Sequence, residues 1–149
     1  QPSDPDPEAR ASIAAWAASE RGQAIAAPMA LDVTVPGWAE GLGPFDAVVC
    51  INMIHIAPWA AALGLFTGAA HCLKPGGRLF LYGPFKREGQ HTAPSNHAFD
   101  ISLKSRNPEW GVRDLDGEVI PAARRFGLIY GDRLAMPANN FSVVFEKRA

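Results

Sequence analysis

The sequence predicts an α/β domain built on a mixed sheet, and two observations carry that prediction. The first is a pair of short apolar runs, Phe45 to Ile51 and Arg78 to Tyr82, which are typical of strands buried on both faces of a parallel sheet. A segment of helical length, about Pro58 to Leu73, separates them and completes a strand–helix–strand pattern. The second is a pair of strand-like runs, Leu128 to Met136 and Phe141 to Lys147, joined by a turn as in an antiparallel hairpin.

The length and composition fit a single domain with a real core, since 48% of the 149 residues are hydrophobic. Fourteen basic and fifteen acidic residues give a net charge of −1, and the basic ones are scattered. This balance argues against nucleic acid or an anionic membrane as partner. Cys50 and Cys72 lack a Cys-x-x-Cys spacing, so we expect no disulfide scaffold, no metal site and a cytoplasmic location.

A first helix is predicted directly after Asp6, whose side chain is suited to cap it. Ile13, Trp16 and Ala17 recur at helical spacing and give the helix an apolar stripe. Gly22 is a natural stop for this helix.

The remaining elements follow from shorter patterns. An apolar run from Ala27 to Val33 predicts a short strand. A helix is expected near Ser95 to Arg106, with Phe99 and Leu103 facing inward, and a last helix near Ile120 to Phe126.

Candidate functional residues follow from the position of each strand. In open α/β sheets, ligands bind outside the carboxyl ends of the strands. The residues directly after each extended run are Asp4, Asp32, Asn52 to His55, and Gly83 to Lys86.

Several blocks of the chain resemble a known class of enzymes. The runs Phe45–Cys50 and Leu73–Leu79, with the closing hairpin, are similar to strands four to seven of class I S-adenosylmethionine-dependent methyltransferases. More narrowly, four blocks resemble the methyltransferase-like 26 family: Gln1–Asp4, Asn52–Ile56, Tyr82–Lys86 and Met136–Asn140. The resemblance covers essentially the whole chain and implies a Rossmann-like three-layer sandwich that binds S-adenosylmethionine.

The chain departs from this class at one important place. The class has a glycine-rich turn after its first strand, and no such segment occurs in the 149 residues. We therefore expect residues 1–149 to form one partial methyltransferase-like domain without the first strand and helix, roughly 30 residues or more. The 45–51 strand is then left with an open edge, which offers a route to self-association.

The resemblance also implies roles for the acidic residues. Asp4 would accept hydrogen bonds from the two ribose hydroxyls, and Asp32 from the adenine amino group, with the Val33 N–H directed at the ring. Each acid has a simpler interpretation as well: Asp4 as a helix cap or solvated loop residue, and Asp32 as a turn residue that ends a strand.

The loop after the 45–51 strand lies beside the transferable methyl group in this class. The resemblance places Asn52 and Met53 against the cofactor, with Asn52 orienting the cofactor or the substrate. His55 is the candidate proton acceptor, because the pKa of an ordinary histidine lies near working pH. The alternative is a structural histidine, since Ile54 and Ile56 flank it. Candidate acceptor-side residues, each also explicable structurally, are Lys86, His91, Asn96, Asn139 and Asn140.

The function indicated by the resemblance is S-adenosylmethionine-dependent methyl transfer to a small or peptide-like nucleophile. One alternative is a non-catalytic pseudo-methyltransferase or interaction module, because the glycine-rich turn is absent. Another is an NAD-dependent Rossmann dehydrogenase, which the closing hairpin and the lack of Gly-x-Gly-x-x-Gly disfavour.

Overall fold

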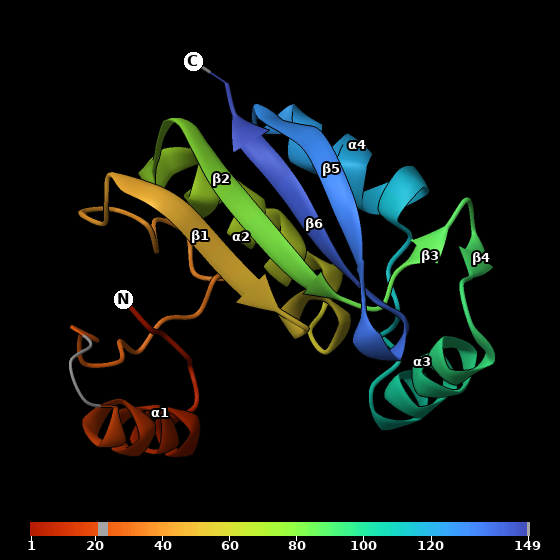
Figure 1. Cartoon of the computed structure of the whole chain (residues 1–149), viewed down its shortest axis with the longest axis horizontal. Coiled ribbons are helices and arrows are strands. Elements are labelled where there is room, and N and C mark those ends of the chain that lie inside the picture. Colours follow the sequence, from red (N-terminus) through yellow and green to blue (C-terminus); the bar gives the residue numbers. More distant parts are fainter. Residues whose placement is uncertain (21–23, 149) are drawn as a thin grey trace.

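A mixed four-stranded sheet forms the centre of the molecule. The computed structural model describes residues 1–20 and 24–148. The strand order is β1-β2-β6-β5, and β1 and β2 run parallel while the other neighbours are antiparallel (Figure 1). The strands span Phe45–Ile51 (β1), Leu73–Gly83 (β2), Leu128–Met136 (β5) and Asn140–Lys147 (β6). The predicted α/β class, the parallel pair and the closing hairpin are confirmed.

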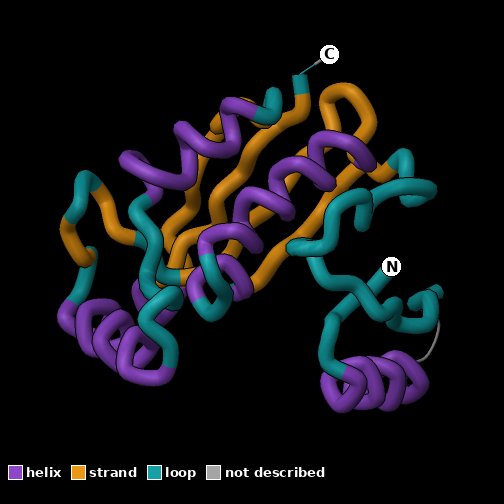
Figure 2. The backbone as a smooth tube through the Cα atoms, turned by 180° about the vertical axis from the view of Figure 1, so that it is seen from behind, coloured by secondary structure: helices purple, strands orange, loops and turns teal. Residues whose placement is uncertain are grey.

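Two helices cover one face of this sheet. Figure 2 shows α2 (Trp59–Cys72) and α4 (Ile120–Arg125) lying across the same side of the strands. Phe66 of α2 and Phe145 of β6 are fully buried there, with their ring centroids 6.5 Å apart. Of the three expected layers, the described residues therefore supply the sheet and one helical layer.

β1 is an edge strand, as expected from the sequence. It pairs with β2, and no other described strand pairs with its outer side. Val49 and Ile51 project from the face opposite α2 and are 63% and 62% exposed. Edge strands with apolar side chains are open to pairing with other chains.

Helix α1 (Pro7–Ser19) begins where the sequence predicts. The Asp6 carboxylate accepts a hydrogen bond from the Glu8 N–H at 2.8 Å, which is the expected cap. The apolar stripe of α1 is not buried, however, and Trp16 is 71% exposed, because α1 lies apart from the sheet in both views. The predicted stop at Gly22 lies outside the described residues.

The predicted strand from Ala27 to Val33 is wrong. Within this run, only Met29 forms a bridge, parallel to Ser3. The Met29 N–H donates to the Pro2 carbonyl at 3.0 Å, and the Met29 carbonyl accepts from the Asp4 N–H at 3.1 Å. An extended run becomes a strand only where a neighbour takes up its backbone groups, and the described residues offer this run a single bridge partner.

The polar middle of the chain forms short elements beside the sheet. Helix α3 spans Pro94–Arg106, close to its predicted bounds, with Leu103 fully buried and Phe99 half-buried. A hairpin of two short strands, β3 (Lys86–Arg87) and β4 (Gln90–His91), precedes α3. Three short helical turns complete the described elements: η1 (Met53–His55), η2 (Leu115–Val119) and η3 (Pro137–Asn139). Helix α4 ends at Arg125, one residue before the predicted end. None of the described helices is long and apolar enough to cross a membrane.

Candidate functional site

The carboxyl ends of β1 and β2 meet, and the loop after each strand begins there. Asn52 follows β1 in the left-handed conformation, with φ 59°, and its N–H donates to the Tyr82 carbonyl at 2.8 Å. Asparagine tolerates this conformation better than most residues. The 3-10 turn η1 follows, and we call residues 52–55 the Asn52 turn. Its Met53 packs partly buried against the core.

His55 ends the Asn52 turn and is completely buried. Its Nδ1 accepts a hydrogen bond from the Arg113 N–H at 3.2 Å, and its carbonyl accepts one from the Gly111 N–H at 2.9 Å. The ring meets Phe85 edge-on, with centroids 4.7 Å apart. Nε2 has no hydrogen-bond partner among the described residues.

Burial, and after it the charge of Arg113, together lower the pKa of His55 to about 3. The ring is therefore neutral, and because Nδ1 accepts a hydrogen bond, the ring proton resides on Nε2. An enclosed, neutral ring that contacts main chain favours the structural interpretation of His55. Its role as proton acceptor stays a prediction.

Gly83, at the end of β2, brings the two loops into contact. A Cβ at this position would lie 2.7 Å from His55 Nε2 and 3.0 Å from Asn52 Oδ1. Any side chain at residue 83 would therefore displace the Asn52 turn, so the close approach of the two loops requires glycine here.

Asp4 and Asp32 lie on the segments before β1. The Asp4 carboxylate accepts the Asp6 N–H at 2.8 Å. Asp32 Oδ1 accepts both the N–H and the hydroxyl of Thr34, and these bonds lower the pKa of Asp32. The carbonyl of Val33 contacts Gly64 on α2. No hydrogen bond joins either acid to the Asn52 turn among the described residues.

The predicted acceptor-side residues meet beyond the end of β2. The buried Asn96 side chain donates to the Asn139 carbonyl at 2.9 Å. Asn140 Nδ2 lies 3.2 Å from the Tyr82 hydroxyl. The hairpin turn thus docks on the start of α3, and these amides have structural partners in the chain.

Two residues that the sequence analysis missed organise this region. Asp100 is buried and pairs with Lys104 at 2.7 Å, Lys86 at 3.5 Å and His91 at 3.4 Å. Burial raises the pKa of Asp100, but the Lys104 and Val112 hydrogen bonds and the Lys86 charge outweigh burial and hold it below its ordinary value. Arg113 is the other. The contacts of Arg113 with residues 54–57 span a long sequence separation, which local patterns do not reveal.

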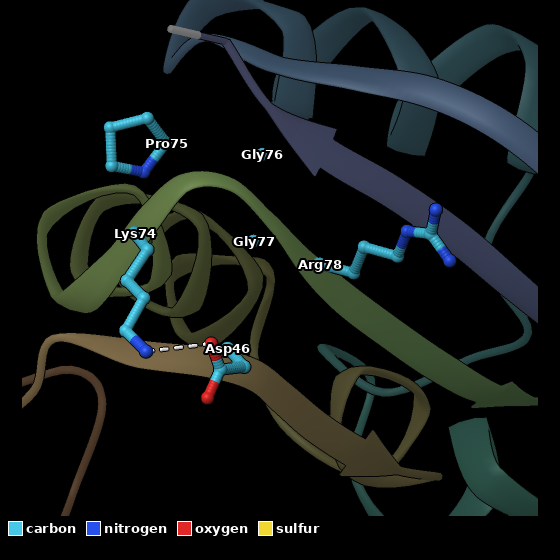
Figure 3. A pocket seen from close by; sticks show the side chains of 6 residues that line it. All are labelled: Asp46, Lys74, Pro75, Gly76, Gly77 and Arg78. Atoms are coloured by element: carbon cyan, nitrogen blue, oxygen red, sulfur yellow. Dashed lines mark hydrogen bonds and ion pairs between the residues drawn. The ribbon is translucent and has the colours of Figure 1, made fainter.

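A cavity of about 310 Å³ lies at the other end of the parallel strands, as Figure 3 shows. It is lined by Asp46, Lys74, Pro75, Gly76, Gly77 and Arg78. The Lys74 ammonium and the Asp46 carboxylate form an ion pair of 2.7 Å across it. It is therefore separate from the end of the sheet where the candidate residues gather.

Residues 1–147 match the family described as "Protein of unknown function (DUF938)". The chain belongs to this family. The match spans the N-terminal segment, the sheet and the closing hairpin together.

A local sequence similarity links this DUF938 chain to a curated methyltransferase. The chain is 49% identical over 43 residues to a ubiquinone biosynthesis O-methyltransferase from Xylella fastidiosa strain M23. This stretch is 29% of the chain and 17% of that relative, so the chain spans only a small part of the curated protein's length.

Solved structures show the same fold. An O-methyltransferase family protein from Burkholderia thailandensis aligns with a TM-score of 0.73 at 18% identity, covering 95% of this chain and 40% of that one. Human N-acetylserotonin methyltransferase in complex with SAM aligns at 0.65 and 14%, covering 90% and 38%. The structure described as "PigF with SAH" aligns at 0.75 and 16%, covering 97% and 42%. The DUF938 chain has the Rossmann-like α/β fold of these methyltransferases.

Proposed function

We propose that the complete native protein is an S-adenosylmethionine-dependent methyltransferase that acts on a small or peptide-like nucleophile. The observation that carries this proposal is the joined pair of loops at the carboxyl ends of β1 and β2, in a fold shared with proteins solved with SAM or SAH. The four sequence blocks quoted above support a methyltransferase-like 26 type of protein. The near-neutral charge favours such an acceptor over nucleic acid, and the free cysteines favour the cytoplasm.

The proposed cofactor residues have the right donors and acceptors. In Asp4 and Asp32, Oδ1 accepts hydrogen bonds from the chain, whereas Oδ2 has no hydrogen bond among the described contacts. A carboxylate oxygen suits a ribose hydroxyl or an adenine amino group. We assign Asp4 to the ribose, Asp32 and the Val33 N–H to the adenine, and Asn52 and Met53 to the neighbourhood of the reacting centre.

The cofactor, when bound, supplies a methyl group already activated on a sulfonium. The residues of the chain then have to position the acceptor and exclude water. Asn52 has a carboxamide at the start of the turn and is able to orient an acceptor. His55 contributes a neutral ring that fixes the turn.

A non-catalytic module is the second candidate function. The His55 ring is enclosed, and its pKa is lowered to about 3. A chain that keeps the fold without cofactor chemistry would show this feature. The two candidates differ in whether the complete native protein binds the cofactor.

Calorimetric titration of the complete native protein with S-adenosylhomocysteine and with NAD tests the proposal. We expect micromolar binding of S-adenosylhomocysteine, about −8 kcal/mol, and none of NAD. Asp4→Ala should weaken that binding roughly tenfold, about 1.4 kcal/mol, because a ribose partner is lost. Asp6→Ala is the matched control, since Asp6 caps α1 and should leave binding unchanged.

Binding of neither nucleotide would favour the non-catalytic module, and binding of NAD would favour the dehydrogenase. Equal losses in the two variants would place Asp4 in the support of the N-terminal segment rather than in the cofactor site.

A further inference from the structure

Residues 111–114 form a short connecting segment that touches both loops at the carboxyl ends of the parallel strands. Toward the loop after β1, the Gly111 N–H donates to the His55 carbonyl at 2.9 Å, and the Arg113 N–H donates to His55 Nδ1 at 3.2 Å. Toward the loop after β2, the Lys86 N–H donates to the Arg113 carbonyl at 2.9 Å. Arg113 is thus hydrogen-bonded to both loops through its main chain.

The Arg113 side chain adds further contacts to the first loop. Nε donates to the Ile54 carbonyl at 3.0 Å, and Nη2 donates to the Ala57 carbonyl at 2.8 Å. Nη2 also donates to the Glu109 carbonyl at 2.8 Å, just before residues 111–114 in the chain. The guanidinium carbon lies 5.4 Å from the centre of the Trp59 ring, at the start of α2.

This use of an arginine is distinctive. The guanidinium forms no ion pair among the described residues. Its hydrogen bonds go to one main-chain carbonyl inside the Asn52 turn, one just after the turn, and one at Glu109. A planar group with several fixed donors holds two carbonyls at once, whereas a lysine ammonium is a single compact donor. The partly buried Arg113 guanidinium therefore stabilises the conformation of the Asn52 turn.

We propose that Arg113 is a positioning residue of the methyl-transfer site, which fixes the Asn52 turn and the Nε2–H form of His55. The inference rests on the proposed function, because it takes the Asn52 turn to lie beside the reacting methyl. Its physical basis is that displacement of a reacting group by about 1 Å can lower the rate by about a hundredfold. Arg113 touches no reacting atom in this assignment and acts through the turn that it holds.

The experiment compares Arg113→Lys and Arg113→Gln with Arg106→Gln in the complete native protein. Arg106 is the matched control, because its guanidinium also lies over a tryptophan, 5.7 Å from the Trp110 ring, but its hydrogen bond stays within α3. S-adenosylhomocysteine affinity, kcat and KM are measured well below the melting temperature of each variant. Release of S-adenosylhomocysteine from S-adenosylmethionine, with an acceptor found by screening, reports turnover.

We expect both Arg113 variants to lose kcat by 10- to 100-fold while their S-adenosylhomocysteine affinity changes less than threefold, and Arg106→Gln to match the wild type. Unchanged kcat in folded Arg113→Lys would overturn the inference, because a residue that only stabilises the fold would lower the melting temperature alone. A wild-type protein that binds no S-adenosylhomocysteine would instead overturn the proposed function, and the inference with it.

A second readout needs no activity. Long-range ¹H–¹⁵N spectra of the histidine rings should show His55 of the wild type as the Nε2–H tautomer from pH 5 to 8. In Arg113→Gln we expect exchange broadening of this signal, because the turn is held less firmly. A sharp, unshifted His55 signal in that variant would contradict the inference even if the variant were inactive.

Discussion

At the scale of single residues, His55 shows how burial changes the chemistry of a side chain. An exposed histidine next to a reacting centre would exchange protons near neutral pH. Here the ring lies under Gly83 and against Phe85, and its pKa falls to about 3. The side chain that looked most reactive in the sequence is held neutral by its surroundings.

The first residue-scale prediction concerns the pH dependence of stability. The native ring binds a proton only near pH 3, whereas the unfolded ring does so near 6.5. Between these values the unfolded state holds the extra proton, so the free energy of unfolding should fall as pH falls, by up to about 1.4 kcal/mol per pH unit. The free energy of unfolding, measured with urea between pH 7 and pH 4.5, should therefore fall more steeply with decreasing pH for the wild type than for His55→Gln.

His91 is the control for this measurement, because burial lowers its pKa as well and Lys86 adds to the effect. His91→Gln should remove a smaller part of the slope than His55→Gln. Parallel curves for the wild type and His55→Gln would show that His55 is accessible when folded. In the complete native protein, His55→Gln that binds S-adenosylhomocysteine normally but loses turnover would support the proton-acceptor role.

At the scale of elements, α2 depends on small residues that let other segments approach it. A Cβ on Gly68 would collide with the Trp38 ring, and one on Gly64 would collide with the Val33 carbonyl. The Trp38 indole N–H donates to the Gly64 carbonyl at 2.9 Å. These contacts anchor the segment that carries Asp32 and Val33 to the sheet domain.

Gly68→Ala should therefore both destabilise the chain, by about 1–3 kcal/mol, and weaken binding of S-adenosylhomocysteine by the complete native protein. The added methyl displaces Trp38 and with it the proposed adenine contacts. Thermal unfolding and calorimetry measure the two effects. Gly131→Ala is the control, since its Cβ would make only an ordinary contact at 3.5 Å. Normal binding by Gly68→Ala would separate Trp38 from the cofactor site.

The elements also show which features the sequence could predict. β1, α2 and β2 were foreseen because each has a strong local pattern and its partner is next along the chain. The 27–33 run has the same apolar character, but whether it forms a strand depends on a neighbouring strand, which no local sequence pattern reveals. The Asn52 turn was found by its position after a strand. Arg113 was missed because its contacts lie 56–59 residues away.

At the scale of the whole molecule, the outer edge of β1 and one face of the sheet are open in the part of the chain that the structure describes. β1 has no described partner on its outer side, and Val49 and Ile51 are mostly exposed on the face without helices. Unpaired strand edges beside apolar side chains favour association of chains.

We therefore expect the 149-residue chain to self-associate as its concentration rises, and Val49→Lys with Ile51→Lys to reduce this. Sedimentation velocity across a concentration series measures the effect. Ile101→Lys is the control, because Ile101 is 57% exposed on α3, away from the edge. Equal association of the two variants would place the contact elsewhere on the surface.

The position of β6 has a consequence for how the protein is made. β2 lies between β1 and β6, and β6 is formed by residues 140–147, so β2 gains its second partner only after residue 147 has been synthesised. A nascent chain contains the residues of β1, α2 and β2 well before those of β6, because synthesis proceeds from the N-terminus. During that interval Leu79 and Leu81 face an unfinished core. A chain that stops before residue 140 would keep β2 paired with β1 alone.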